Sequence, residues 1–246
     1  PLQASGRRRA ATGARAGRMT NILSYLAIAF LWLLHWLPLP ALRALGWGLG
    51  RLLYVLARAR REIALTNLRL CFPEMPEAER QNLARAHFVA FSRAVLDRTL
   101  GWWASRERLE RIIRIAGAEH LSDPGGRPTI VLSPHFVGLD AGGTRTSMLI
   151  AGCSLYSNQR NPVFNKLLYD GRMRFNEALL LSRQEGIRRI VKALKDGYPF
   201  YYLPDQDFGR KESIFVPFFG IQTATIPALS RLVRLTGARV VPCITR

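Results

Sequence analysis

The chain has 246 residues and a formal net charge of +19, with 36 lysines and arginines against 17 aspartates and glutamates. This length can bury a full core as one domain or two small ones, and the basic excess must face something anionic, namely nucleic acid, an anionic membrane leaflet or a phosphorylated substrate. The three cysteines have no disulfide or metal-ligand spacing, which excludes a disulfide-stabilised scaffold and a zinc module and favours a body that faces the cytosol.

Residues 1–18 are rich in arginine, alanine and glycine and lack hydrophobic periodicity, so we expect a disordered basic leader. Met19 follows directly and is the candidate for the natural start, which makes the leader an upstream extension; a transit-type presequence is the alternative. Residues 19–59 are predicted to form a membrane anchor and an interfacial amphipathic helix, and residues 60–246 a globular domain.

The anchor prediction rests on residues 22–37, which carry no charged side chain. A helix of this length reaches about 24 Å, short of the roughly 30 Å hydrocarbon core of a bilayer. Pro38 and Pro40 then break the helix, and the next stretch places leucines on one face and arginines elsewhere. All five tryptophans lie within the first 103 residues, which favours headgroup contact, although ordinary core tryptophans are the alternative. We therefore expect a short inserted or re-entrant anchor rather than a complete span.

After two more prolines the pattern predicts a long helix over Glu77–Ala104, and beyond it strand-like and helical segments alternate. The expected strands are Thr129–Ser133, Cys153–Ser157, Pro199–Leu203, Ile214–Phe218 and Arg239–Thr245. The expected helices between them are Leu139–Ile150, Pro162–Asn176, Gln184–Asp196 and Ile226–Thr236. This alternation predicts an α/β fold with a mixed, mostly parallel sheet flanked by helices, preceded by the N-terminal hydrophobic membrane-anchor helix.

The first candidate site follows the strand that begins at Thr129. The strand leads to His135, with Asp140 five residues further on. A carboxylate at this distance can orient an imidazole and stabilise its charge when the ring takes a proton from a hydroxyl. Active sites of open α/β folds lie beyond the carboxyl ends of strands, where His135 is expected. A structural histidine that caps a helix start is the alternative.

Two further clusters are candidates for substrate binding. Arg160 and Asn161 open a predicted helix that carries Arg172 and Arg174, and arginines near a helix N-terminus suit a phosphate or a phosphopantetheine arm. Solvated surface arginines are the alternative.

Asp205 and Asp207 follow another strand and could bind a divalent metal or orient substrate hydroxyls, or form only an Asp/Gly turn. Their one-residue spacing without further ligands argues against a dedicated metal site. Phosphate-loop, dinucleotide and nucleophile-elbow motifs are absent from the sequence, which leaves direct transfer onto a hydroxyl with His135 as base.

A series of motifs resembles one family along most of the chain. In order they are NLRLCFPEMPEAER at 67–80, HFVGLD at 135–140, RNP at 160–162, GRMRFN at 171–176, ALKDG at 193–197, PDQDFG at 204–209 and VPFFG at 216–220. Their order from about Met19 to Arg246 resembles the bacterial lipid A biosynthesis acyltransferases, the late lauroyl and myristoyl transferases. These belong to the lysophospholipid acyltransferase-like group, whose motif is H-x4-D/E.

The resemblance implies an acyltransferase domain over residues 60–246 with an acyl–acyl-carrier-protein donor and no cofactor or metal. It implies a lipid A precursor as acceptor, a phosphorylated and hydroxyacylated glucosamine disaccharide in the bacterial inner membrane, with the active site facing the cytoplasm. His135 would take the proton of the acceptor's 3-hydroxyacyl chain and Asp140, which is glutamate in many members, would hold the imidazole. Arg172 and Asp207 match polar positions of the family's active site. Family members continue past the equivalent of Arg246, so a truncated C-terminus is expected.

Other readings of the sequence stay open. The acceptor of the same reaction could be a lysophospholipid, an ornithine lipid or a glycolipid. A different class is a non-catalytic basic protein that binds anionic membranes. Because no nucleic-acid motif is present and the tryptophans lie near the anchor, we expect no nucleic-acid partner. We also expect a monomer.

Overall fold

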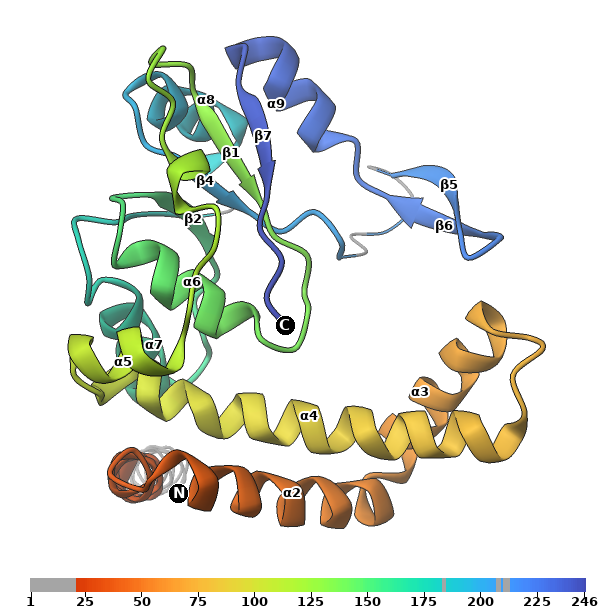
Figure 1. Cartoon of the computed structure of the whole chain (residues 1–246). Coiled ribbons are helices and arrows are strands. Elements are labelled where there is room, and N and C mark those ends of the chain that lie inside the picture. Colours follow the sequence, from red (N-terminus) through yellow and green to blue (C-terminus); the bar gives the residue numbers. More distant parts are fainter. Residues whose placement is uncertain (1–20, 183–184, 207–208, 210–212) are drawn as a thin grey trace, which may run out of the picture.

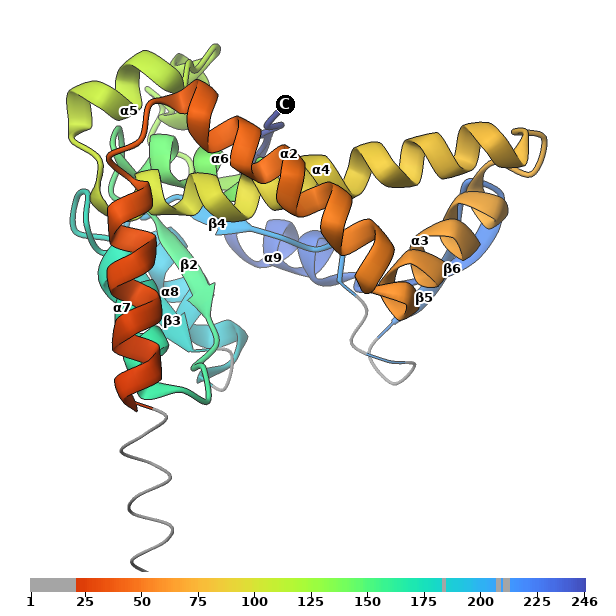
Figure 2. The same cartoon turned by 90° about the horizontal axis from the view of Figure 1, so that it is seen from below.

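The computed structural model describes residues 21–182, 185–206, 209 and 213–246, so the predicted leader and Met19 lie outside the described residues. The first half of the described chain is a layer of helices. It contains a helix over residues 21–34, then α2 (Leu39–Leu56), α3 (Arg58–Cys71) and the long α4 (Glu77–Trp103). In Figure 1, α2 and α4 run side by side at the bottom of the molecule, and Figure 2 shows the same layer from below.

The helix breaks in this layer have local causes. Pro38 has extended backbone angles (φ −62°, ψ 147°) and precedes α2, as the prolines predict. Ala57, with φ −87° and ψ 61°, separates α2 from α3. The predicted amphipathic stretch is therefore two helices, and the expected boundary between residues 59 and 60 falls inside α3.

α2 packs on α4 through small residues rather than through its leucine-rich face. Its buried residues are Leu42, Gly46 and Gly50. A β-carbon at Gly50 would lie 2.5 Å from the Cα of Val89, and one at Gly46 would lie 2.8 Å from the Cα of Arg93. The two backbones are so close that only glycine fits at these two positions, and this contact sets the distance between the helices.

Beyond α4, α5 (Arg106–Ile112) and a 3₁₀ turn (Ala118–Leu121) lead into a five-stranded sheet. Its strands, in the order β3-β2-β4-β1-β7, are all parallel to their neighbours. They are β1 (Thr129–Leu132), β2 (Cys153–Tyr156), β3 (Leu179–Ser182), β4 (Phe200–Tyr202) and β7 (Arg239–Pro242). The crossover helices are α6 (Leu139–Ser147), α7 (Pro162–Arg172), α8 (Ile187–Lys195) and α9 (Ala228–Thr236). α6 and α7 cover one face and α8 and α9 the other (Figure 1), as right-handed crossovers require.

The expected α/β fold with a mostly parallel sheet flanked by helices is confirmed. The predicted strand Ile214–Phe218 is confirmed with the same bounds, but it lies outside this sheet. It forms β5, which pairs antiparallel with β6 (Ile221–Thr225) in a hairpin that projects away from the sheet (Figure 1). The outer strand beside β2 is instead β3, a segment for which the sequence pattern predicted no strand.

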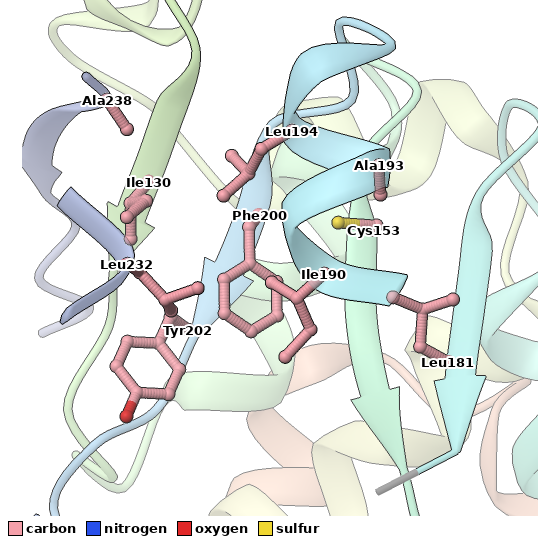
Figure 3. Packing of buried hydrophobic residues seen from close by; sticks show 10 residues of the cluster. All are labelled: Ile130, Cys153, Leu181, Ile190, Ala193, Leu194, Phe200, Tyr202, Leu232 and Ala238. Carbon is pink, nitrogen blue, oxygen red and sulfur yellow. The ribbon is translucent and has the colours of Figure 1, made fainter. Parts of the chain in front are cut away.

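The main core lies between the sheet and the α8–α9 layer. Phe200 of β4 is fully buried at its centre, with Ile130 of β1, Leu181 of β3, Leu194 of α8 and Leu232 of α9 around it (Figure 3). A second core joins the helical layer to the sheet domain and contains Leu34, Leu42, Leu96, Leu100, Leu109, Met148 and Phe175. α4 supplies the central residues of this second core.

The N-terminal helix and α2 also carry a broad apolar surface. Their exposed large side chains are Ile22, Leu23, Tyr25, Leu26, Phe30, Trp32, Leu33, Trp36, Leu45, Trp47, Leu52, Val55 and Leu56. Apolar surfaces of this extent mark interaction sites for membranes or partner proteins. Within the ranges that the structure describes, no helix has both the length and the apolar character needed to cross a bilayer.

The close packing of α2 on α4 predicts opposite effects for two neighbouring glycines. Gly50→Ala forces a methyl group into the backbone of α4, so we expect destabilisation by about 1–3 kcal/mol. Gly48 lies on the same helix, and a β-carbon there would meet no other part of the protein within 4 Å, so Gly48→Ala should gain up to about 1 kcal/mol of helix propensity. Thermal unfolding of both variants in detergent measures the difference. A Gly50→Ala protein that melts at or above the wild-type temperature contradicts this packing.

Candidate active site

Strand register brings two polar loops together. β1 and β4 are neighbours in the sheet, with Leu132 opposite Tyr202. Each strand is followed by one residue, a proline and then a titratable side chain, which is His135 after β1 and Asp205 after β4. The residue before a proline is held extended, so the two chains continue in parallel past the strand ends. His135 therefore stays level with Asp205, although 70 residues separate them in the sequence.

This point of the sheet is also where its connections diverge. From β1 the chain crosses one face of the sheet through α6 and continues to β2. From β4 it passes through β5 and β6, crosses the other face through α9 and continues to β7. Open α/β sheets bind ligands at such a switch point, beyond the carboxyl ends of the strands. The carboxyl ends of β1 and β7 point toward α4 in Figure 1.

Two hydrogen bonds join His135 to Asp205. The backbone N–H of His135 donates to Asp205 Oδ2 at 2.7 Å, and His135 Nδ1 lies 2.6 Å from Asp205 Oδ1. The side chains are 36% and 39% exposed, so a ligand can reach them. Partial burial acts to raise the pKa of the Asp205 carboxyl, but the hydrogen bonds from His135 outweigh it and hold that pKa below its ordinary value. The contact thus stabilises the folded state at neutral pH, and this contribution is lost as the pH falls through the lowered pKa.

The ionised carboxylate decides which imidazole nitrogen carries the proton. A carboxylate only accepts hydrogen bonds, so His135 Nδ1 must donate. In the neutral ring, Nε2 then has the lone pair that can accept a hydrogen bond or a proton. The side-chain amide nitrogen of Gln206 lies 3.0 Å from Nε2 and donates to it. The imidazole therefore presents a basic nitrogen at an accessible position, which is the form that a general base requires.

Asp140 does not make the contact expected of it. It lies in the first turn of α6, where its Oδ2 is 2.5 Å from Nε of Arg98 on α4. The described partners of the His135 ring are Asp205 and Gln206. In this structure strand register aligns His135 with Asp205, while the turn into α6 places Asp140 beside Arg98, so orientation of the imidazole by Asp140, and with it a part in catalysis, stays a prediction.

Arg160 and Asn161 lie in the connection between β2 and α7. The Asn161 side chain caps α7, accepting hydrogen bonds from the backbone N–H groups of Val163 and Phe164 at 2.9 and 3.2 Å. Its amide donates to Ser24 Oγ at 2.8 Å and so ties α7 to the N-terminal helix. These contacts give Asn161 a structural part, while Arg160 is exposed and substrate binding by it stays a prediction.

Arg172 and Arg174 lie close together in sequence but have different surroundings. Arg172 donates to the Leu155 carbonyl at 3.2 Å, and its guanidinium lies 5.6 Å from the centre of the Tyr156 ring. Arg174 donates to the carbonyl of Gly101 at 3.0 Å and to that of Ala104, at the end of α4. A cation is favourable at this end of a helix, so Arg174 caps α4, and substrate binding by it stays a prediction.

Asp207 lies outside the described residues, and its predicted contact with substrate stays a prediction. Asp205, the other member of the predicted aspartate pair, is engaged by His135. In the described part of the chain, no three histidine, cysteine, aspartate or glutamate side chains gather so that they could hold a metal ion.

Two residues of this region were not singled out from the sequence. Gln206 contacts the ring of His135. The sequence Pro204-Asp205-Gln206 carries no signal that distinguishes it from an ordinary turn. Arg98 is one of several arginines in a long helix, so nothing in its local pattern marks it. The repeated x-Pro-polar sequence after β1 and β4 was a usable signal for the His135–Asp205 pair.

Comparison with known sequences identifies the family of the chain. The sequence model of the bacterial lipid A biosynthesis acyltransferases matches residues 12–246. The lipid A biosynthesis lauroyltransferase of Escherichia coli (strain K12) is 34% identical over 227 residues, which cover 91% of this chain and 74% of the relative. The palmitoleoyltransferase of the same organism is 32% identical over 219 residues (88% and 71%), and its myristoyltransferase is 35% identical over 210 residues (82% and 62%).

A histidine paired with a carboxylate at the switch point of a parallel α/β sheet defines a class of candidate site, and the sequence match specifies the family. The chain belongs to the bacterial lipid A biosynthesis acyltransferase family.

The contacts of Arg174 predict that its loss affects stability rather than binding. Arg174→Gln removes a charged donor from two carbonyls at the end of α4, and we expect a loss of about 1.5–3 kcal/mol in the free energy of unfolding. Arg160→Gln is the matched control, because Arg160 is exposed and should change stability by less than about 0.5 kcal/mol. Denaturant unfolding in detergent compares the two, and equal stability of both variants refutes the capping role.

Proposed function

We propose that the protein transfers a fatty acyl chain from an acyl carrier protein to a hydroxyl of a lipid A precursor, with His135 as general base. The observation that carries the proposal is the His135–Asp205 pair at the switch point of the sheet, in a chain of the lipid A biosynthesis acyltransferase family. The donor thioester supplies the activated acyl group, so the proposed reaction uses no metal and no cofactor.

In the proposed step, Nε2 of His135 takes the proton of the acceptor hydroxyl while the hydroxyl oxygen attacks the thioester carbonyl carbon. The new C–O ester bond forms, the C–S bond breaks, and the leaving thiolate takes the proton from the imidazolium. The acceptor hydroxyl enters where the Gln206 amide now contacts Nε2, so Gln206 has to move aside.

The proposal gives Asp205 the orienting part that the sequence motif suggested for Asp140. A carboxylate on Nδ1 keeps the ring in the tautomer whose Nε2 is basic, and its negative charge stabilises the imidazolium that forms. Asp140 then does not contact the ring, and it acts indirectly through its contact with Arg98.

The surface of the molecule supports a membrane-bound acceptor and an acidic donor. The exposed apolar side chains of residues 21–56 include Trp32, Trp36 and Trp47, and such indole rings favour the headgroup zone. The net charge of +19 suits both an acidic carrier protein and lipid phosphates. We therefore propose that the protein acts as a monomer at the bacterial inner membrane, with His135 facing the cytoplasm, from which the carrier protein arrives.

The direct test is acyl transfer from lauroyl- and myristoyl-carrier protein onto a tetra-acylated lipid A precursor, in membranes that contain the full-length protein. His135→Ala should lower kcat by about 10²- to 10⁴-fold, because the base is lost. His120→Ala is the matched control, since the His120 side chain is 67% exposed and belongs to the 3₁₀ turn Ala118–Leu121, before β1. Full turnover by His135→Ala would overturn the mechanism. Turnover only with a lysophospholipid, an ornithine lipid or a glycolipid would overturn the proposed acceptor.

The tautomer argument makes a second prediction, for Asp205→Asn. If the amide of asparagine donates to Nδ1, the ring proton moves to Nε2 and the base is lost, so we expect kcat to fall by about 10⁴-fold with little change in KM. The same assay measures both constants. A kcat within a factor of about three of wild type contradicts the orienting part of Asp205.

A further inference from the structure

α4 connects the helical layer to the sheet domain. On one side it packs against α2, through the close approach at Gly46 and Gly50. On the other side its last turns pack against α6 and α7. A β-carbon at Gly101 of α4 would lie 3.1 Å from Thr144 Oγ1 of α6, so these two helices are also in close contact. A displacement of α4 would therefore also displace α6.

Arg98 lies on α4 at this crossing and contacts Asp140, in the first turn of α6, at 2.5 Å. The two side chains are 42% and 45% exposed. Exposed ion pairs add only about 0–1 kcal/mol to the free energy of unfolding, so this pair contributes little to the stability of the fold. Its position is more informative, because Asp140 follows His135 by five residues.

The loop that carries His135 is fixed at both ends. At its start, β1 is paired with β4 and His135 is bound to Asp205. At its end, α6 begins beside Arg98, and a β-carbon at Gly138 would lie 2.7 Å from the Thr245 side chain that follows β7. The start of α6 is therefore held between α4 and the chain after β7, with the Arg98–Asp140 contact as its charged attachment.

We infer that Arg98 is a positioning residue for the acyl transfer proposed above: through Asp140 it holds the start of α6, and with it the His135 loop, in place on α4. The inference rests on the proposed function and extends it to a residue outside the H-x4-D motif. It also explains how an aspartate that does not touch the imidazole can matter for the reaction. A misplacement of a catalytic group by about 1 Å costs about 10²-fold in rate, which sets the expected size of the effect.

A double-mutant cycle tests this inference. Arg98→Gln, Asp140→Asn and the double variant of the full-length protein are compared with wild type in the transfer assay. We expect each single variant to lower kcat by about 10²-fold with little change in KM. The kcat of the double variant should be no lower than that of the less active single variant. Losses that multiply in the double variant show independent roles and overturn the inference. Wild-type kcat for Arg98→Gln beside a low kcat for Asp140→Asn also overturns it.

The pH profile separates this role from direct contact with the base. If Asp140 acts through Arg98, the acid limb of the kcat–pH profile of Asp140→Asn keeps the wild-type midpoint. Only the maximal kcat of the profile is lower. A carboxylate that faces the imidazole in the reacting state would instead shift that midpoint when it is neutralised, and such a shift in Asp140→Asn overturns the inference.

Two controls keep the outcomes apart. Arg189 of α8 pairs with Glu185 at 3.0 Å, with side chains 57% and 40% exposed, so Arg189→Gln removes a comparable ion pair elsewhere and should keep the wild-type kcat. Equal melting temperatures of Arg98→Gln and Arg189→Gln exclude unfolding as the cause of a lower rate. If His135→Ala is inactive but the cycle is additive, the inference fails alone; if His135→Ala retains turnover, the proposed function fails as well.

Discussion

The parallel pairing of β1 with β4 is the constraint on which the candidate site depends. Neither strand is longer than four residues, yet their register determines which side chains meet three positions beyond their ends. The prolines before His135 and Asp205 carry the extended backbone past the last ladder hydrogen bond. A shift of one residue in this register would place Pro204 or Gln206 opposite His135 and leave the imidazole without its carboxylate.

The second support of the molecule is α4, a helix buried from two sides. Its residues Val89 and Arg93 face α2, while Gly101 and Trp102 face α6 and α7 of the sheet domain. The apolar surface of residues 21–56 and the base after β1 are thus parts of one framework. A lipid held against that surface would have a defined position relative to His135.

Periodicity along the chain predicted the elements better than their partners. The long helix, β1, β2, β4, β7 and the crossover helices lie where the pattern placed them. β3 was missed because its leucines favour a helix as readily as a strand, and only pairing with β2 decides the matter. β5 was expected in the sheet, but Ile214 and Phe215 are both exposed, so alternation carried no information about its position.

The same limit applies to the site. His135 was identified because strand ends carry chemistry in α/β folds, but spacing in the sequence pointed to Asp140 as its partner. Distance along the chain does not determine distance across a sheet, and Asp205, 70 residues away, occupies the position. Asn161 and Arg174 were expected near substrate, and both instead satisfy backbone groups at helix ends. Polar residues at helix ends often have this role.

The strand order has a consequence for how the protein is made. β4 lies between β1 and β2, so these two earlier strands have no partner in each other and must wait for the segment Phe200–Tyr202 to be inserted between them. During synthesis, His135 leaves the ribosome 70 residues before Asp205, and pairings of such long range form late and slowly. The contacts of α2 with α4, which join Gly46 to Arg93 and Gly50 to Val89, involve only residues made well before then. The helical layer can therefore fold before the pair of His135 and Asp205 can form.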